Sequence, residues 1–219
     1  MNDSVPTPFP GRTTLRQLDD ATRGLIRLAA VIASGDEQQI RSALADAVDS
    51  VSRSWVEELI LQSYLFCGFP RSLNAMREWR RLTGQHALLS AETEDVKEWR
   101  RRGEATCEQV YGAMYDRLRV NILALHPELD DWMIVEGYGK VLSRPGLDLP
   151  RRELCIVAAC AASRQDRQLH SHLHGAVNVG VAPEVVSEAI DALEGILPAP
   201  GLTSAKLLWR RVQNQLSSS

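Results

Sequence analysis

Apolar residues recur every three or four positions along most of the chain, which is the spacing of amphipathic helices. Up to residue 83, this spacing predicts helices over 15–34, 40–51, 55–67 and 73–82. Gly35 would end the first helix, and Gly68 with Pro70 would separate the last two. Ser54 and Glu57 have the spacing of a capping box, so we expect them to begin the third helix.

The same spacing continues in the second half and predicts helices over 110–125 and 129–142. The segment 151–180 has the pattern of a helical hairpin. Its first arm, Leu154–Ala162, is rich in alanine and shows no strand-like alternation, so we interpret it as a buried helix. A charged corner, Ser163–Asp166, precedes a second helix that carries three histidines. The whole chain is therefore predicted to be all-α.

The hairpin contains one carboxylate and one histidine whose positions predict a contact. Glu153 lies near the start of the first helix, 19 positions before His172. At about 100° per residue, His170 and His174 share one face of the second helix, and His172 points nearly opposite. Glu153 and His172 would then meet across the hairpin and form a minimal acid–base pair.

Each of these residues also has a simpler explanation. A carboxylate at position 153 is favoured by the dipole at a helix N-terminus, whatever its function. A histidine on a face of alanine and leucine, such as His172, is more often a hydrogen-bonded core residue than a catalytic one. His170 and His174 have the i, i+4 spacing of metal ligands, but the sequence offers no evident third ligand, so we predict no metal site.

The front of the chain resembles its end at a nearly constant distance. The matches lie 129 positions apart at first, and 130 apart after one inserted residue. They include Leu25 with Leu154, Leu44 with Leu173, and Trp79–Arg81 with Trp209–Arg211. We predict a tandem duplication of a helical unit. Gly24 stands where the second copy has Glu153, and Ala43 where it has His172, so the first copy is expected to be structural.

Composition narrows the possible functions. The chain has 219 residues, of which 44% are apolar and 5% aromatic, and its net charge is −3. This charge gives no reason to expect nucleic acid or an anionic membrane as a partner. No apolar run reaches the roughly 18 residues of a membrane span, and the N-terminus shows no hydrophobic signal core. The four cysteines, Cys67, Cys107, Cys155 and Cys160, lack zinc-type spacing, so we expect reduced thiols and a cytoplasmic protein.

The second half also contains a string of short motifs: Arg101–Gly103, Glu136–Gly139, Ser143–Asp148, Arg152–Leu154, Gln168–Leu169, His172, Gly175–Asn178 and Gly180–Val181. Together they resemble the γ-carboxymuconolactone decarboxylase family, within the wider carboxymuconolactone decarboxylase and alkylhydroperoxidase-D-like superfamily. The resemblance covers about residues 95–195 and implies the all-α fold of that superfamily. Tyr64–Pro70 is similar to the segment that follows the histidine helix in the decarboxylases. Residues 193–200, which occupy that place here, have lost the pattern. The site is therefore either completed by residues of the first copy or altered.

The peroxidase branch of the superfamily has a C-x-x-C pair between its glutamate and its histidine. Gln165 and Gln168 stand at those positions in this chain. Peroxidase chemistry needs a reactive thiolate and a second, resolving thiol. We therefore predict no thiol peroxidase activity, and interpret Cys155 and Cys160 as small buried residues.

The resemblance implies a lyase of aromatic-compound breakdown that removes CO2 from a carboxylated unsaturated lactone without metal or organic cofactor. His172 would donate the proton that completes the reaction, and Glu153 would orient or charge it. Arg144 and Arg152 would bind substrate carboxylates, and Gln168 would add a hydrogen bond. Arg144, next to a proline, has the alternative role of anchoring a loop. A non-catalytic or repurposed helical oligomer that binds a small molecule is the alternative function.

The predicted organisation has four parts. They are a mobile N-terminal arm over 1–13, a degenerate repeat over 14–83, a helical connection over 84–149, and the repeat with the site over 150–216. Duplicated members of the family resemble trimers, so we expect a homotrimer. The expected partners are a small-molecule substrate and further copies of the chain, with neither nucleic acid nor membrane.

Overall fold

The computed structural model describes residues 14–86 and 95–217, and the predicted arm over 1–13 lies outside them. The helices are α1 (Asp20–Ser34), α2 (Glu37–Ser50), α3 (Arg53–Thr83), α4 (Val96–Tyr111), η1 (Gly112–Met114), α5 (Tyr115–Leu125), α6 (Pro127–Trp132), η2 (Met133–Leu142), α7 (Leu149–Ala162), α8 (Asp166–Asn178), α9 (Pro183–Asp191) and α10 (Ala199–Leu216). Pairing between extended segments in these two ranges is limited to isolated bridges, such as Leu15 with Val181. The protein is all-α, as predicted.

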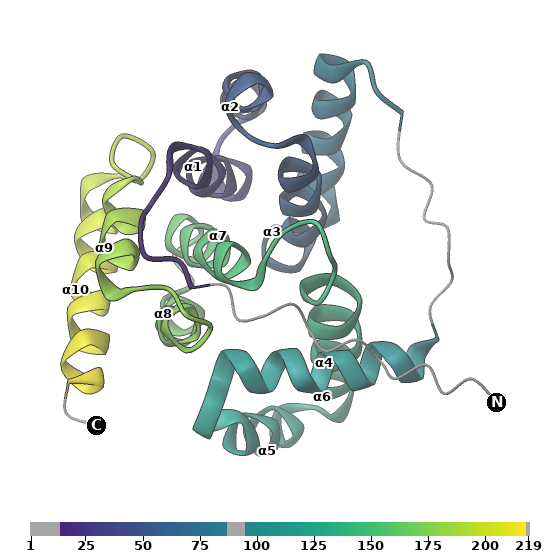
Figure 1. Ribbon diagram of the computed structural model, residues 1–219, viewed down its shortest axis with the longest axis vertical. Helices are drawn as coiled ribbons and strands as arrows, with labels where there is room; N and C mark the ends of the chain where they lie inside the picture. Colours follow the sequence, from purple (N-terminus) through teal and green to yellow (C-terminus); the bar gives the residue numbers. More distant parts are fainter. Residues whose placement is uncertain (1–13, 87–94, 218–219) are drawn as a thin grey trace.

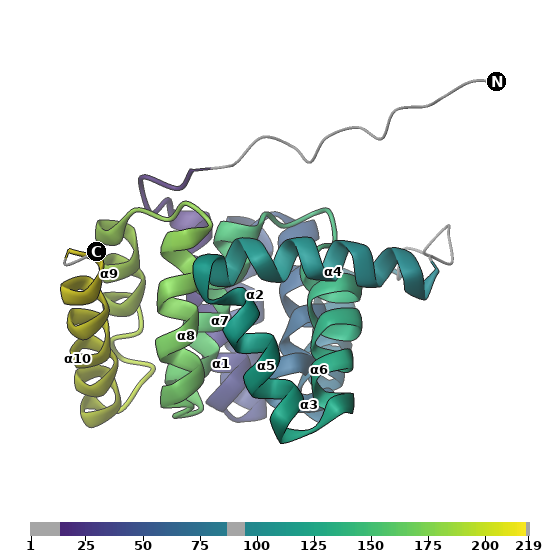
Figure 2. The same ribbon diagram turned by 90° about the horizontal axis from the view of Figure 1, so that it is seen from below.

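Helix α7 lies at the centre of the molecule (Figure 1). It contacts α1, α3, α8, α9 and α10, and every residue from Arg152 to Ala161 is buried. This confirms the prediction of a buried alanine-rich helix. Helix α4 runs across the ends of other helices (Figure 2) and packs on both α8 and η2. The central helix thus receives side chains from both halves of the chain.

The first predicted helix begins later than expected. Helix α1 starts at Asp20, because the side chain of Asp19 accepts a hydrogen bond from the backbone N–H of Thr22 and caps it. Leu15 instead lies in an extended segment, where its N–H donates to the carbonyl of Gly180 at 3.0 Å. The prediction started the helix too early because Leu15 is buried and fits the helical spacing, although its backbone is extended.

The predicted capping box of Ser54 and Glu57 is wrong. Helix α3 begins at Arg53 without a side-chain cap, and Glu57 instead forms a bidentate ion pair with Arg80 at 2.6 and 3.0 Å. The predicted break between two helices is confirmed at Gly68, whose φ of 78° is not helical. The two parts of α3 therefore have different directions around this residue.

Residues 129–142 do not form one regular helix. The short α6 is followed by η2, which has the wider π-helical hydrogen bonding. Gly139 of η2 packs so closely on α4 that an added Cβ would lie 1.9 Å from the carbonyl oxygen of Trp99. This close contact fixes α4, and with it Tyr111 at the end of that helix, next to α8.

The helix positions support the proposed duplication. Helices α1 and α7 begin 129 residues apart, as do α2 and α8, whereas α3 and α9 begin 130 apart. Ion pairs also cross between the proposed repeats in both directions: Arg152 with Glu58 at 2.8 Å, and Arg23 with Glu188 at 3.8 Å. These four residues are related by the same offsets of 129 and 130. An internal two-fold relationship between two copies would produce this exchange.

In the described part of the chain, none of the helices combines the length and the apolar character needed to cross a membrane.

Candidate active site

The site is built on the α7–α8 hairpin. The side chain of Asp148 caps α7 by accepting a hydrogen bond from the N–H of Arg151 at 3.0 Å. The helix ends at Ala162, and Arg164 turns the chain with a positive φ of 57° before α8 begins at Asp166. The predicted charged corner is thereby confirmed, and it sets α8 against α7.

Glu153 of α7 and His172 of α8 face each other, as the spacing predicts. The His172 Nδ1 and Glu153 Oε2 atoms are 2.8 Å apart. The exposed fractions of these residues are 0% for Glu153 and 3% for His172. Gly175 leaves space for the carboxylate, because an added Cβ there would lie 2.6 Å from Glu153 Oε2. One residue without a side chain on α8 thus makes the buried contact possible.

The second carboxylate oxygen of Glu153 is buried without a hydrogen-bond partner among the described residues. Buried polar atoms usually have a partner, and an isolated one costs free energy. The two oxygens therefore differ, because Oε2 contacts the histidine and Oε1 is enclosed without a described partner.

Aromatic rings surround the imidazole of His172. Phe66 of α3 meets it edge-on, with ring centroids 5.8 Å apart, and Tyr111 of α4 lies at 6.4 Å. Tyr138 of η2 packs against Tyr111 at 6.2 Å. Burial raises the pKa of both tyrosines above their usual value, so their hydroxyls stay protonated and can only donate or accept hydrogen bonds.

Phe66 answers a question that the sequence left open, because it brings the first half of the chain into contact with the histidine of the second half. It belongs to the segment Tyr64–Pro70, whose resemblance to the family pattern was the available signal. Tyr111 was not predicted as a site residue. Its position depends on how α4 packs on α8, which no local pattern reveals.

The two predicted arginines lie in a separate cluster around Glu58 of α3. Arg152 is fully buried and donates to Glu58 Oε2 at 2.8 Å and to Gln62 Oε1 at 3.0 Å. Arg144, whose side chain is 40% exposed, donates to Glu58 Oε1 at 3.0 Å. Burial lowers the pKa of Arg152, and the neighbouring Glu58 opposes this effect. Arg152 and Glu153 are consecutive, yet one faces α3 and the other faces α8.

The remaining predicted residues lie at the surface of α8. Gln168 is exposed one turn before His172, and Gln165 is exposed where the helix begins. His170 and His174 share a face, with ring centroids 5.0 Å apart, as predicted. Over 14–86 and 95–217, no group of three His, Cys, Asp or Glu side chains suited to a metal ion is found.

All four cysteines are free thiols. Burial raises the pKa of Cys160 to about 12 and raises that of Cys155 as well. Cys107 is also buried, and Cys67 is half-buried, with its pKa again raised by burial. A thiol that stays protonated at neutral pH is a poor nucleophile. The sulfur environment therefore differs from that of a thiol peroxidase.

Two comparisons with known proteins bear on this site. Residues 127–209 match the model of the carboxymuconolactone decarboxylase family, and this range includes both Glu153 and His172. Over 172 residues the chain is also 27% identical to Peroxisomal protein 2 of Schizosaccharomyces pombe. That alignment covers 75% of this chain and 80% of the relative. Both findings support the resemblance at the level of the superfamily.

Proposed function

We propose that the protein is a cofactor-independent carboxy-lyase. The proposed substrate is a carboxylated unsaturated lactone, of the kind met in the breakdown of aromatic compounds, or a related enolisable acid. The observation that carries the proposal is the 2.8 Å contact between Glu153 and His172 within the segment that matches the decarboxylase family. The unpartnered Oε1 of Glu153 adds a polar atom that a bound molecule would use.

The pair suits the proton transfer that such a reaction needs. When CO2 leaves, the electrons of the broken C–C bond pass into a dienolate that ends at the lactone carbonyl. Imidazolium at His172 then donates its Nε2 proton to carbon, and Glu153 stabilises the positive ring through Nδ1. Solvent reprotonates the imidazole afterwards. Because His172 is only 3% exposed, we propose that the ring of Phe66 or Tyr111, both of which contact the imidazole, moves when substrate enters.

Arg144 is the proposed contact for a substrate carboxylate, because its side chain is 40% exposed while still bound to Glu58. Gln168 is exposed on α8 and is proposed as a further hydrogen-bond partner. Arg152 is enclosed by Glu58, Gln62 and backbone carbonyls. We therefore propose that it acts on substrate through Glu58, by holding the partner of Arg144.

The test is an assay of CO2 release from carboxymuconolactone. Wild type is compared with His172→Ala and Glu153→Gln, and His170→Ala serves as a control on the same helix. We expect turnover to fall by at least about a hundredfold in the first two variants, because general acid catalysis commonly contributes that much. Unchanged turnover in both would contradict the assigned roles. Absence of turnover in the wild type would contradict the assigned reaction.

A non-catalytic or repurposed binding protein is the second candidate, and the burial of His172 is the observation that favours it. A buried Glu–His pair also stabilises a fold without catalysing anything. Thiol peroxidase activity is disfavoured, because glutamines occupy positions 165 and 168 and burial raises the pKa of all four thiols.

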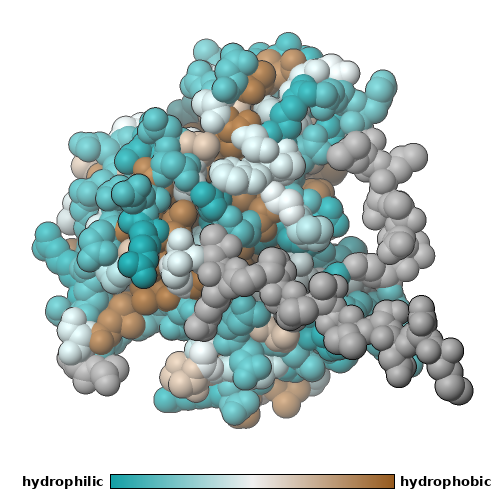
Figure 3. Space-filling view, in the orientation of Figure 1, coloured by the Kyte–Doolittle hydropathy of each residue, from teal (hydrophilic) through white to brown (hydrophobic). Residues whose placement is uncertain are grey.

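We propose that the chain forms a homotrimer. Exposed large apolar side chains on and beside α5 and α6 support self-association: Met114, Val120, Leu123, Leu125, Leu129 and Trp132. Figure 3 shows further apolar areas, separated by polar ones, on the face viewed there. Sedimentation equilibrium should give three times the chain mass, and a stable monomer would contradict the proposal.

For localisation we propose a reducing compartment such as the cytosol, and the name of the yeast relative suggests the peroxisome as the other candidate.

A further inference from the structure

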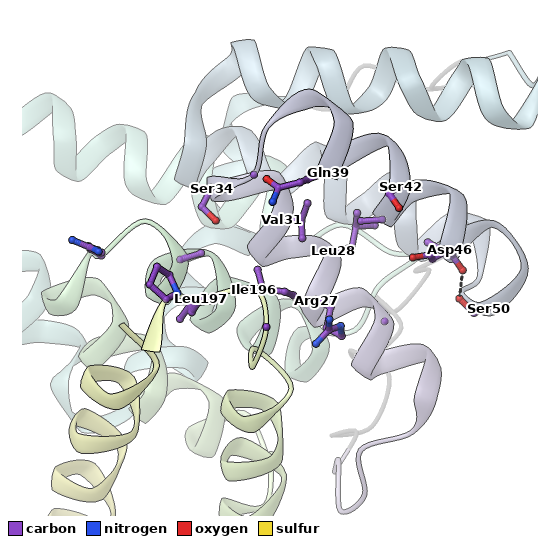
Figure 4. A pocket seen from close by; sticks show the side chains of 18 residues that line it. Arg27, Leu28, Val31, Ser34, Gln39, Ser42, Asp46, Ser50, Ile196 and Leu197 are labelled. Atoms are coloured by element: carbon purple, nitrogen blue, oxygen red, sulfur yellow. Dashed lines mark hydrogen bonds between the residues drawn. The ribbon is translucent and has the colours of Figure 1, made fainter. Parts of the chain in front are cut away.

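A groove of about 570 Å³ is lined by neither Glu153 nor His172. It runs between α1 and α2, and is closed at one side by the end of α7 and the segment 195–198 (Figure 4). Its lining includes Gly24, Leu28, Val31, Ala43, Ala47, Ala162, Ile196, Leu197 and Pro198 on the apolar side. The polar side includes Arg27, Ser34, Gln39, Ser42, Asp46, Ser50 and Arg164.

The groove is the first repeat's counterpart of the acid–base site. Gly24 and Ala43 line it, and they stand 129 positions before Glu153 and His172. Ile196 also lines it, 130 positions after Phe66, the residue that packs on His172. Each proposed repeat thus supplies an apolar side chain to the site of the other. In the first repeat, Ala43 lines open space where the second repeat has an imidazole. A Cβ added at Gly24 would lie 3.2 Å from Val51 Cγ2, so the open space is on the Ala43 side.

The charges of the groove indicate what it binds. Arg27 and Arg164 contribute two guanidinium groups, whereas Asp46 contributes one carboxylate, so the lining carries one net positive charge. Arg27 donates through one nitrogen to the carbonyls of Ala192 and Glu194, which holds its side chain beside the segment 195–198. Arg164 has an exposed side chain and the positive φ of 57° at the α7–α8 corner. A guanidinium group with free donors matches a carboxylate or sulfonate.

We infer that this groove is a non-catalytic binding site for a small organic monoanion with an apolar body. The apolar side of the lining would bury the body of the ligand, and Arg164 would bind its acid group. The inference rests on the proposed duplication and not on the proposed decarboxylation.

The test uses two fluorescent probes with the same aromatic body. 8-Anilinonaphthalene-1-sulfonate carries one negative charge, and N-phenyl-1-naphthylamine carries none. We expect Ala43→Phe to weaken the binding of both probes at least about tenfold, because the new ring fills the groove. Arg164→Gln should weaken the binding of the anionic probe about tenfold, since the charge-assisted hydrogen bond is lost. The affinity for the neutral probe should stay within about twofold of the wild-type value.

Matched variants keep the result specific. Ala45→Phe adds the same ring to α2 at an exposed position outside the groove, and should leave both probes unchanged. His172→Ala should also leave both unchanged, which separates this site from the proposed catalytic one. Ala43→Leu fills the groove with a smaller side chain if the phenylalanine variant fails to fold. The inference would be overturned if Arg164→Gln weakened the binding of both probes equally. It would also be overturned if both Ala43 variants bound the probes as tightly as wild type. A changed sedimentation of Ala43→Leu would overturn it too, by identifying the groove as an interface between copies.

Discussion

Phe66 and His172 meet edge-on, with ring centroids 5.8 Å apart and planes at 85°. They come from the two halves of the chain, so the candidate site exists only when α3 has packed against the α7–α8 hairpin. Phe69, three residues later on α3, is 61% exposed and stacks on Tyr64 instead. These two phenylalanines offer a direct comparison between a ring at the site and a ring beside it.

Phe66→Ala should change the environment of the His172 imidazole, because it removes an aromatic edge from the ring. We expect the His172 imidazole resonances to shift in heteronuclear NMR spectra. Phe69→Ala should leave them in place. The stability cost of Phe66→Ala should be below the roughly 3–5 kcal/mol typical of a fully buried phenylalanine, since Phe66 is half-buried. Equal shifts in both variants would mean that the edge-on contact does not define the environment of the histidine.

Gly175→Ala should destabilise the protein. The added Cβ would lie 2.6 Å from Glu153 Oε2 and 2.8 Å from Val110 Cγ1, both in a buried site. We expect a loss of about 1–3 kcal/mol in the free energy of unfolding, measured with urea. Gly201→Ala in α10 is the control, since its Cβ would meet nothing within 4 Å. That control should be neutral or more stable by up to about 1 kcal/mol, because alanine favours helix. A neutral Gly175→Ala would contradict the close contact.

Arg152 and Arg144 should differ in what they contribute, although both bind Glu58. Arg152→Met leaves Glu58 without its buried partner, so we expect the free energy of unfolding to fall by about 3–5 kcal/mol. Arg144→Met removes a side chain that is 40% exposed, and should cost about 1 kcal/mol or less. Urea denaturation checks both values. A stable Arg152→Met variant with impaired substrate binding would instead favour the role in direct substrate binding that the sequence suggested.

The ion pair between Asp130 and Arg119 should make the free energy of unfolding depend on pH in the acidic range. Arg119 donates to both carboxylate oxygens at 2.7 and 2.8 Å, and these hydrogen bonds lower the pKa of Asp130. Because the folded pKa lies below the unfolded value of about 3.9, the stabilisation is complete above that pH and is lost as the pH falls through the folded pKa. At pH 7, Asp130→Asn should cost about 1.5–3 kcal/mol.

The difference between wild type and Asp130→Asn should therefore shrink below about pH 4, as measured by urea denaturation across the acid range. Asp131→Asn is the control, because Asp131 is 42% exposed in its pair with Arg100. It should cost less than about 1 kcal/mol at any pH. A difference for Asp130→Asn that stayed constant down to pH 2 would show that its carboxylate is not stabilised by Arg119.

The thiols should react slowly in the native protein. Burial raises the pKa of Cys107, Cys155 and Cys160, so a thiolate reagent such as 5,5′-dithiobis(2-nitrobenzoate) should leave these three unmodified at pH 8. Cys67 is half-buried and should react alone and slowly. All four should react once guanidinium chloride unfolds the chain. Rapid modification of two thiols in the native protein would contradict our conclusion that thiol peroxidase activity is disfavoured.

From local sequence patterns we could predict the all-α class, the buried character of α7, the corner at Ser163–Asp166 and the contact of Glu153 with His172. These features follow from local rules: the 3.6-residue period, the capping residues and the short separation across a hairpin. Errors occurred where a tertiary contact competed with a local pattern. Glu57 has the right spacing for a capping box, but Arg80 is the stronger partner for its carboxylate.

The distant side chains that complete each cluster depend on how the helices pack against one another. Phe66 and Tyr111 reach His172 from helices about 106 and 61 positions away, and no periodicity encodes such a contact. The roles of Arg152 and Glu153 diverge for the same reason, because a turn of about 100° between consecutive helical residues directs them at different neighbours. The open space beside Ala43 was likewise visible in sequence only as a small residue. The packing of the segment 195–198 against α1 and α2 makes it a groove.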